Sequence, residues 1–160
     1  MTKADNMRKV HEHIIQIPPF VTRALLWRGL EQVARHPEQF VEHMEGCEIL
    51  SENLLEEVMH LAREVNFGGD FHLRDKVILK KGESVKTVVE AGKTWPASSF
   101  LMKIEEPEQG SLFVRFIYEA DEPLEALNPM VQQLRRQAYE TKDRDLIERI
   151  IKSILQGDLS

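Results

Sequence analysis

Apolar and polar residues alternate with a period of two over most of residues 46–120, which is typical of β-strands that bury one face. The loops between these segments are short and contain Gly or Asn, as loops between antiparallel neighbours do; two of them are predicted at 51–53 and 107–110. A segment rich in β-branched residues adds one strand before Pro18, at which a strand must end. The predicted strands are 9–17, 47–50, 57–67, 71–80, 84–91, 98–105 and 112–119.

Two segments have helical spacing instead. Residues 23–36 follow Thr22 and Pro129–Leu155 follows Asn128, and both preceding residues are good N-caps. The apolar stripe of the second segment lapses at 141–143, where the helix could bend or break. The pattern therefore predicts an α+β fold, in which the terminal helix covers the one buried face of an antiparallel sheet of about seven strands. The side chains expected to face the sheet are Leu134, Ala138, Ile147 and Ile150.

The alternation also predicts a register for one hairpin. A loop at 68–70 aligns the apolar positions of strands 57–67 and 71–80, and the same alignment places Arg63 opposite Asp75 on the apolar face. Two interpretations remain open. The sheet could twist so that both groups reach solvent at an edge, or the pair could be a polar anchor in a cavity wall, with the guanidinium free to meet an anionic or carbonyl group.

Composition and charge narrow the class of protein. The 160 residues are 42% apolar and 30% charged, which predicts one globular domain over 1–160 with a flexible start at 1–8. The net charge of −6 argues against a nucleic-acid binder. The single Cys47 allows no internal disulfide, and no apolar run is long enough to span a membrane, so a cytoplasmic protein is expected.

The motifs of known chemistry are missing. The sequence has no phosphate-binding loop, nucleophile elbow or dinucleotide fingerprint, so no cofactor is expected. His11 and His13 share a face of the first strand without an acidic or histidine partner at metal-binding spacing, and solvated histidines are expected there. Tyr118 lies on an apolar face, where its hydroxyl needs a partner if it is buried.

Four segments carry a resemblance to a known family: LWRGL at 26–30, RDKV at 74–77, MKIEEP at 102–107 and LFVRF at 112–116. With the order of the elements, they resemble the AtaL-like family of the START and birch-pollen-allergen superfamily, over nearly the whole chain. The resemblance implies a helix-grip fold, in which a curved seven-stranded sheet wraps around the C-terminal helix and encloses a hydrophobic cavity. Members of that superfamily bind lipids, sterols, polyketides or plant hormones, and some are cyclases or dehydratases.

Three functions compete. The first is the binding of a small apolar or amphipathic ligand between sheet and helix. The second is an enzyme of cyclase or hydrolase type that uses Asp75 or Tyr118 as acid or base, and the third is a co-chaperone-like module that binds a protein partner. The ligand binder ranks first, because the sequence places only an arginine near Asp75. The ligand site is predicted at Leu61, Arg63, Asp75, Val77, Val89, Met102, Phe116, Tyr118 and Leu134, without a metal.

Overall fold

One antiparallel sheet holds the seven strands found in residues 7–122 and 128–158, the part of the chain that the computed structural model describes; its strand order is β1-β7-β6-β5-β4-β3-β2. Residues 1–6 of the predicted flexible start lie outside that part, and β1 already begins at Arg8. The strands are β1 (Arg8–Gln16), β2 (Gly46–Leu55), β3 (Val58–Asn66), β4 (His72–Lys80), β5 (Ser84–Val89), β6 (Ser98–Glu108) and β7 (Ser111–Ala120). The helices are α1 (Arg23–Arg35), the short 3-10 turn η2 (Pro37–Gln39) and α2 (Pro129–Leu155).

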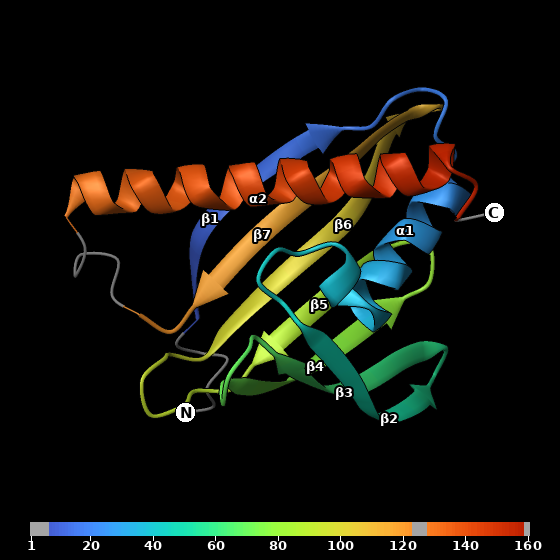
Figure 1. Cartoon of the computed structure of the whole chain (residues 1–160). Coiled ribbons are helices and arrows are strands. Elements are labelled where there is room, and N and C mark those ends of the chain that lie inside the picture. Colours follow the sequence, from blue (N-terminus) through green and yellow to red (C-terminus); the bar gives the residue numbers. More distant parts are fainter. Residues whose placement is uncertain (1–6, 123–127, 159–160) are drawn as a thin grey trace.

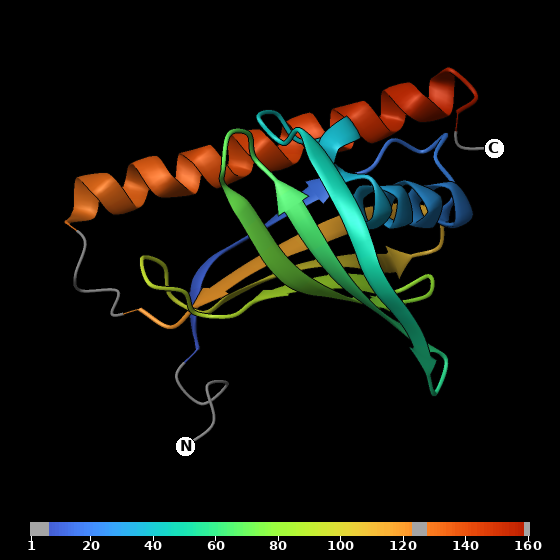
Figure 2. The same ribbon diagram turned by 60° about the horizontal axis from the view of Figure 1, so that its bottom comes forward.

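The sheet is curved, and both α1 and α2 lie on its concave face (Figures 1 and 2). Burial along β7 shows why: every second residue from Leu112 to Ala120 is buried, and the residues between them are half-buried. An antiparallel sheet with one apolar face has to be covered on that face only. The fold predicted from the alternation and the resemblance is therefore confirmed.

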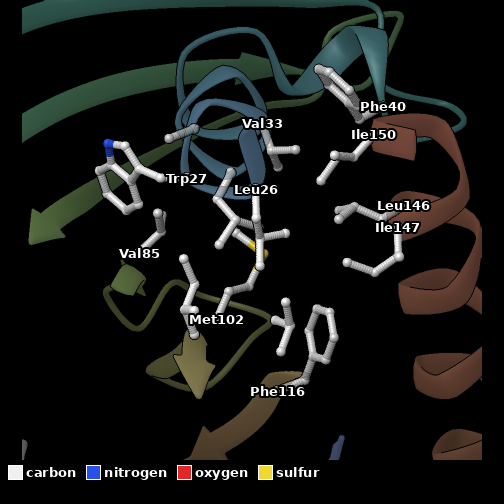
Figure 3. Close-up of a cluster of buried hydrophobic side chains, with 14 of the residues drawn as sticks. Leu26, Trp27, Val33, Phe40, Val85, Met102, Phe116, Leu146, Ile147 and Ile150 are labelled. Carbon is white, nitrogen blue, oxygen red and sulfur yellow. The ribbon is translucent and has the colours of Figure 1, made fainter. Parts of the chain in front are cut away.

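The centre of the concave face is a packed apolar core and not an empty cavity. Figure 3 shows how side chains of α1, among them Leu26, meet Met102 and Phe116 of the sheet and Ile150 of α2. Gly29 of α1 faces Ile150, and a Cβ at that position would overlap the Ile150 side chain. The absence of a side chain in the LWRGL segment thus lets the two helices approach closely.

Two predicted loops are parts of strands. β2 continues through the predicted loop 51–53 after a register shift between Ile49 and Ser51, and the turn comes at Glu56 and Glu57, which both have positive φ. β6 likewise runs through the predicted loop 107–110 as far as Glu108, with a register shift after Glu105. In both places a β-bulge admits polar residues and Pro107 into a strand, which alternation alone does not reveal.

Helix α2 is continuous through 141–143, but its packing against the sheet begins only at Tyr139. Leu146, Ile147 and Ile150 are buried, whereas Leu134 is 59% exposed and Ala138 is also exposed. The prediction that Leu134 and Ala138 pack against the sheet is wrong, because the first turns of α2 extend beyond the sheet (Figure 1). Neither described helix has the length and apolar content needed to cross a membrane.

Candidate functional site

Arg63 and Asp75 form the predicted pair across β3 and β4. The two residues are register partners, and both are buried, at 5% and 8% exposure, which rules out the interpretation of an exposed edge. Arg63 Nε donates to Asp75 Oδ1 at 2.8 Å and Nη2 to Oδ2 at 2.6 Å, while Nη1 donates to the carbonyl of Ala34 at 2.6 Å. That carbonyl belongs to the last turn of α1, whose final carbonyls have no partner within the helix. The guanidinium therefore ties α1 to the sheet.

The remaining predicted site residues are divided among three environments. Leu61, Val77, Met102 and Phe116 belong to the packed core, and Leu134 lies on the exposed part of α2. Val89 and Tyr118 both lie in the wall of a cleft. Neither Arg63 nor Asp75 lines this cleft. A direct contact between this pair and a ligand stays a prediction. In the structure, the pair hydrogen-bonds within the protein, to each other and to the carbonyl of Ala34.

The cleft has a volume of about 460 Å³ and lies between α2 and the concave side of β4–β7. Five of its lining residues are aromatic: Phe71, Trp95, Phe100, Tyr118 and Tyr139. The other lining residues are Val10, Leu73, Thr87, Val89, Pro96, Ser98, Ser99, Glu119, Ala120, Glu122, Arg135 and Lys142. This mostly apolar wall with a few polar groups is the usual composition of a small-molecule site.

The β5–β6 loop holds one aromatic ring at the rim of the cleft. Trp95 Nε1 donates to the carbonyl of Glu90 at 3.0 Å, and the amide of Gly92 donates to the carbonyl of Trp95 at 3.0 Å. A Cβ on Gly92 would overlap the indole, so the loop needs glycine at this position. The indole also meets the Phe71 ring edge-on, with 6.1 Å between ring centroids. The rim is thus a fixed aromatic wall.

A buried polar cluster lies behind the cleft, and Asp143 of α2 is its centre. Asp143 is fully buried and accepts the Tyr118 hydroxyl at 2.7 Å to each carboxylate oxygen. His13 Nε2 lies 2.7 Å from Asp143 Oδ2. Asp143 precedes Leu146 and Ile147 by three and four residues, so it shares their buried helix face. The centre of this cluster therefore lies at 141–143, where the apolar stripe of the helix is interrupted.

Burial governs the ionisation of the cluster. It raises the pKa of the Asp143 carboxyl, against the opposing effects of Lys142 and of the hydrogen bonds from His13 and Tyr118. Burial raises the pKa of Tyr118 far above its ordinary value, and the neighbouring Asp143 charge adds to this. Tyr118 is therefore held as a protonated donor to Asp143.

The histidines of β1 are not solvated, which corrects the expectation from the sequence. The side chains of His11 and His13 are each 10% exposed and face α2, where His11 Nε2 lies 3.2 Å from Glu140 Oε2. Burial, followed by the proximity of His13, lowers the pKa of His11. Both rings stack on aromatic neighbours, His11 on Tyr139 and His13 on Phe116. Within the described residues, no group of three His, Cys, Asp or Glu side chains is arranged to hold a metal ion.

Lys142 connects the cluster with the cleft. Its ammonium nitrogen lies 4.6 Å from the ring centroid of Phe100, 5.0 Å from that of Tyr118 and 5.9 Å from that of Tyr139. The same nitrogen is 3.9 Å from Asp143 Oδ1, and the side chain keeps 41% exposure. Partial burial lowers the pKa of Lys142, and Asp143 opposes the shift. Ring faces attract a cation, so the ammonium is held at the cleft wall.

Sequence reasoning missed His13, Trp95, Tyr139, Lys142 and Asp143. A signal existed for two of them. Asp143 lies on the apolar face of its helix, and His13 has the same strand parity as the buried Ile17. A charged or polar residue on an apolar face needs a buried partner, as Arg63 and Asp75 did. The positions of Trp95 and Tyr139 depend on the loop conformation and the helix position, for which the sequence holds no comparable signal.

Comparisons with known proteins found one matching family model and several solved structures with a similar fold. Residues 12–157 match the family model described as AtaL, acetylaranotin biosynthesis cluster protein L, and no curated protein matches in sequence. Among solved structures, Ara h 8.0201 is similar with a TM-score of 0.60 at 14% identity, over 91% of this chain and 99% of that chain. The Zhui aromatase/cyclase from Streptomyces sp. R1128 has a TM-score of 0.59 at 14% identity, over 92% and 96%. A START superfamily protein from Mycobacterium smegmatis has a TM-score of 0.58 at 14% identity, over 91% and 97%. At such identities the likeness of the structures concerns the fold alone.

Proposed function

The chain belongs to the AtaL family, within the superfamily of START proteins and the birch pollen allergen, and on this premise we propose that it binds a small apolar or amphipathic ligand in the cleft between α2 and the sheet. The observation that carries the proposal is the cleft itself. Five aromatic side chains gather on its walls, at the place where the packed core ends and α2 leaves the sheet.

The cleft offers a ligand mainly apolar contact. Burying apolar surface contributes about 2.5 kcal/mol for every ~100 Å² removed from water, and aromatic walls add stacking with a planar ligand. Trp95 and Phe100 are half-buried and Phe71 is 49% exposed, so each ring keeps a surface that a ligand could cover. The packed core leaves no such surface at Met102 or Phe116.

The polar groups favour an enzyme only as a second candidate. Among the described residues, no titratable group other than Arg63 hydrogen-bonds to Asp75, which speaks against acid or base chemistry at that carboxylate. The hydrogen-bonded chain from His13 through Asp143 to Tyr118 does reach the cleft wall. A cyclase or hydrolase would use this chain, and one similar structure is titled an aromatase/cyclase. If a ligand that is incubated with the protein is recovered chemically unchanged, the result favours a ligand-binding protein over an enzyme.

A pair of substitutions on β5 tests the proposal. Val89 lines the cleft, whereas Val88, the residue before it, has the opposite parity and lies on the outer face of the sheet. We expect Val89→Trp to fill the cleft and Val88→Trp to leave it open. The probe is phenylnaphthylamine, a neutral aromatic dye whose fluorescence rises in an apolar site.

The parent protein and Val88→Trp are expected to bind the dye with equal dissociation constants. Val89→Trp should bind it at least about tenfold more weakly, because an indole occupies the space that the dye needs. Circular dichroism and thermal unfolding of both variants serve to check that they are folded. If the parent does not bind the dye, or if both variants bind it as the parent does, the proposed site is wrong.

A further inference from the structure

Among the described residues, the cleft wall carries one cation, Lys142, that has no carboxylate within hydrogen-bond distance. Of the two cationic residues that line it, Arg135 is ion-paired with Glu122, so its guanidinium is already matched. The other is Lys142, and its nearest carboxylate oxygen in the described residues is Asp143 Oδ1, at 3.9 Å. That separation is beyond hydrogen-bond distance.

Asp143 has two partners that lie closer to it than Lys142 does. Its two oxygens accept the Tyr118 hydroxyl, and Oδ2 has His13 Nε2 as a further neighbour at 2.7 Å. The ammonium instead lies over the rings of Phe100, Tyr118 and Tyr139. Ring faces attract the charge, but they accept none of its three N–H donors as an oxygen would. Among the described residues, no side chain or carbonyl hydrogen-bonds to Lys142 Nζ.

We infer that the cleft selects a planar aromatic or conjugated ligand that carries an anionic oxygen group, with Lys142 binding the anion and the aromatic wall stacking on the ring system. The inference rests on the proposed function and names its ligand class. A carboxylate, phenolate or sulfonate would supply the charged acceptor that the ammonium lacks, in a site partly withdrawn from water, where a charge-assisted hydrogen bond is strong. The half-buried Phe100 and Trp95 would face the planar part.

Two dyes that differ mainly by one charge test this inference. Anilinonaphthalenesulfonate has the ring system of phenylnaphthylamine plus a sulfonate. Both are titrated into the full-length parent, Lys142→Met and Lys142→Gln, with Lys152→Met as the matched control, since Lys152 is an exposed lysine of the same helix and does not line the cleft. The dissociation constant of the anionic dye should rise about tenfold or more in both Lys142 variants, since they lose a charge-assisted hydrogen bond. The neutral dye should bind Lys152→Met as it binds the parent, and both Lys142 variants should lose far more affinity for the anionic dye than for the neutral dye.

The outcomes separate the inference from the proposed function. If the parent does not bind the neutral dye, the ligand cleft itself is refuted. If all four proteins bind the neutral dye and the anionic dye binds the Lys142 variants as tightly as the parent, the anion site is wrong and the apolar cleft stands. An equal loss of the anionic dye in Lys152→Met would also overturn the assignment to Lys142, because it would reflect the overall charge. Val89→Trp, which blocks the cleft, should lose both dyes; anionic dye retained there is bound elsewhere and counts against the inference.

Discussion

Among single residues of the described part of the chain, Asp75 and Asp143 are buried carboxylates in different surroundings. Asp75 is matched by a full bidentate ion pair with Arg63, and a third guanidinium hydrogen bond reaches α1. Asp143 has a neutral hydroxyl and a histidine as its hydrogen-bond partners, and the ammonium nitrogen of Lys142 lies 3.9 Å away. Burial disfavours an ionised carboxylate unless charge and hydrogen bonds compensate it. The first carboxylate is therefore a structural link, whereas the second belongs to the buried cluster behind the cleft and accepts a hydrogen bond from Tyr118 of the cleft wall.

Asp75→Asn should destabilise the protein by about 3 kcal/mol or more, because it leaves the buried Arg63 without a counter-ion. The matched control is Lys76→Gln on the exposed face of the same strand, for which a change below about 0.5 kcal/mol is expected. Denaturant unfolding of the two variants measures both values. Small and equal effects would contradict a role of the pair in holding α1 to the sheet.

Asp143→Asn should change how stability depends on pH. The raised pKa of Asp143 means that, above its ordinary value near 3.8, the folded state holds a proton that the unfolded state has already lost. The free energy of unfolding therefore falls as pH rises through that window, by up to about 1.4 kcal/mol for each unit by which the pKa is raised. The lowered pKa of His11 acts in the opposite direction below pH 6.5, and it is present in parent and variant alike.

The quantity to measure is the difference in the free energy of unfolding, parent minus Asp143→Asn, by urea unfolding between about pH 4 and 7. This difference should decline with rising pH, since only the parent has to ionise the buried carboxyl. Asp145→Asn, two residues along the helix at a 46% exposed side chain, is the matched control for removing a carboxylate from α2. Parallel profiles for parent and Asp143→Asn would refute the perturbed carboxyl.

Among the elements, the two halves of α2 differ in how they contact the rest of the fold. The second half packs Leu146, Ile147 and Ile150 into the core, whereas the first half leaves Met130 and Leu134 exposed beyond the sheet. The polar residues 142 and 143 lie where these halves meet, beside the cleft. The helix therefore anchors the fold at one end and forms a cleft wall near its middle.

Ile147→Ala should cost about 2–5 kcal/mol, because the side chain is 3% exposed and its removal leaves a cavity in the core. Leu134→Ala, at 59% exposure on the same helix, should cost less than about 0.5 kcal/mol. Thermal or denaturant unfolding measures both. A large loss from Leu134→Ala would show that the first half of α2 is packed after all.

Local patterns predicted most elements and one register. The pairing of Arg63 with Asp75 follows from two alternating strands joined by a short loop, since a buried face and a short loop together fix the register. The bulges that lengthen β2 and β6 could not be predicted, because an inserted residue breaks the alternation on which the prediction depends. The partners of β1 were also out of reach: it pairs with β7, about a hundred residues later in the chain, with no short loop to set the register.

At the scale of the whole molecule, the position of the cleft follows from how the concave face is divided. Parity predicted correctly the buried face of β3 to β7, but it missed the inward histidines of β1 and could not show that α1 fills the central part around Met102 and Phe116. What remains open lies toward Phe71, Trp95 and the middle of α2. The site therefore depends on how the sheet, the loop that carries Trp95 and α2 pack together. Of the predicted site residues, only Val89 and Tyr118 line the cleft.

The most direct test of the central claim is native mass spectrometry of the protein purified from its own host, for the parent, Val88→Trp and Val89→Trp. We expect the parent and Val88→Trp to carry the same small non-covalent ligand, which is released on denaturation, and Val89→Trp to carry none. A parent protein that is bare in every charge state, or a ligand equally present on Val89→Trp, would contradict a ligand site between α2 and the sheet.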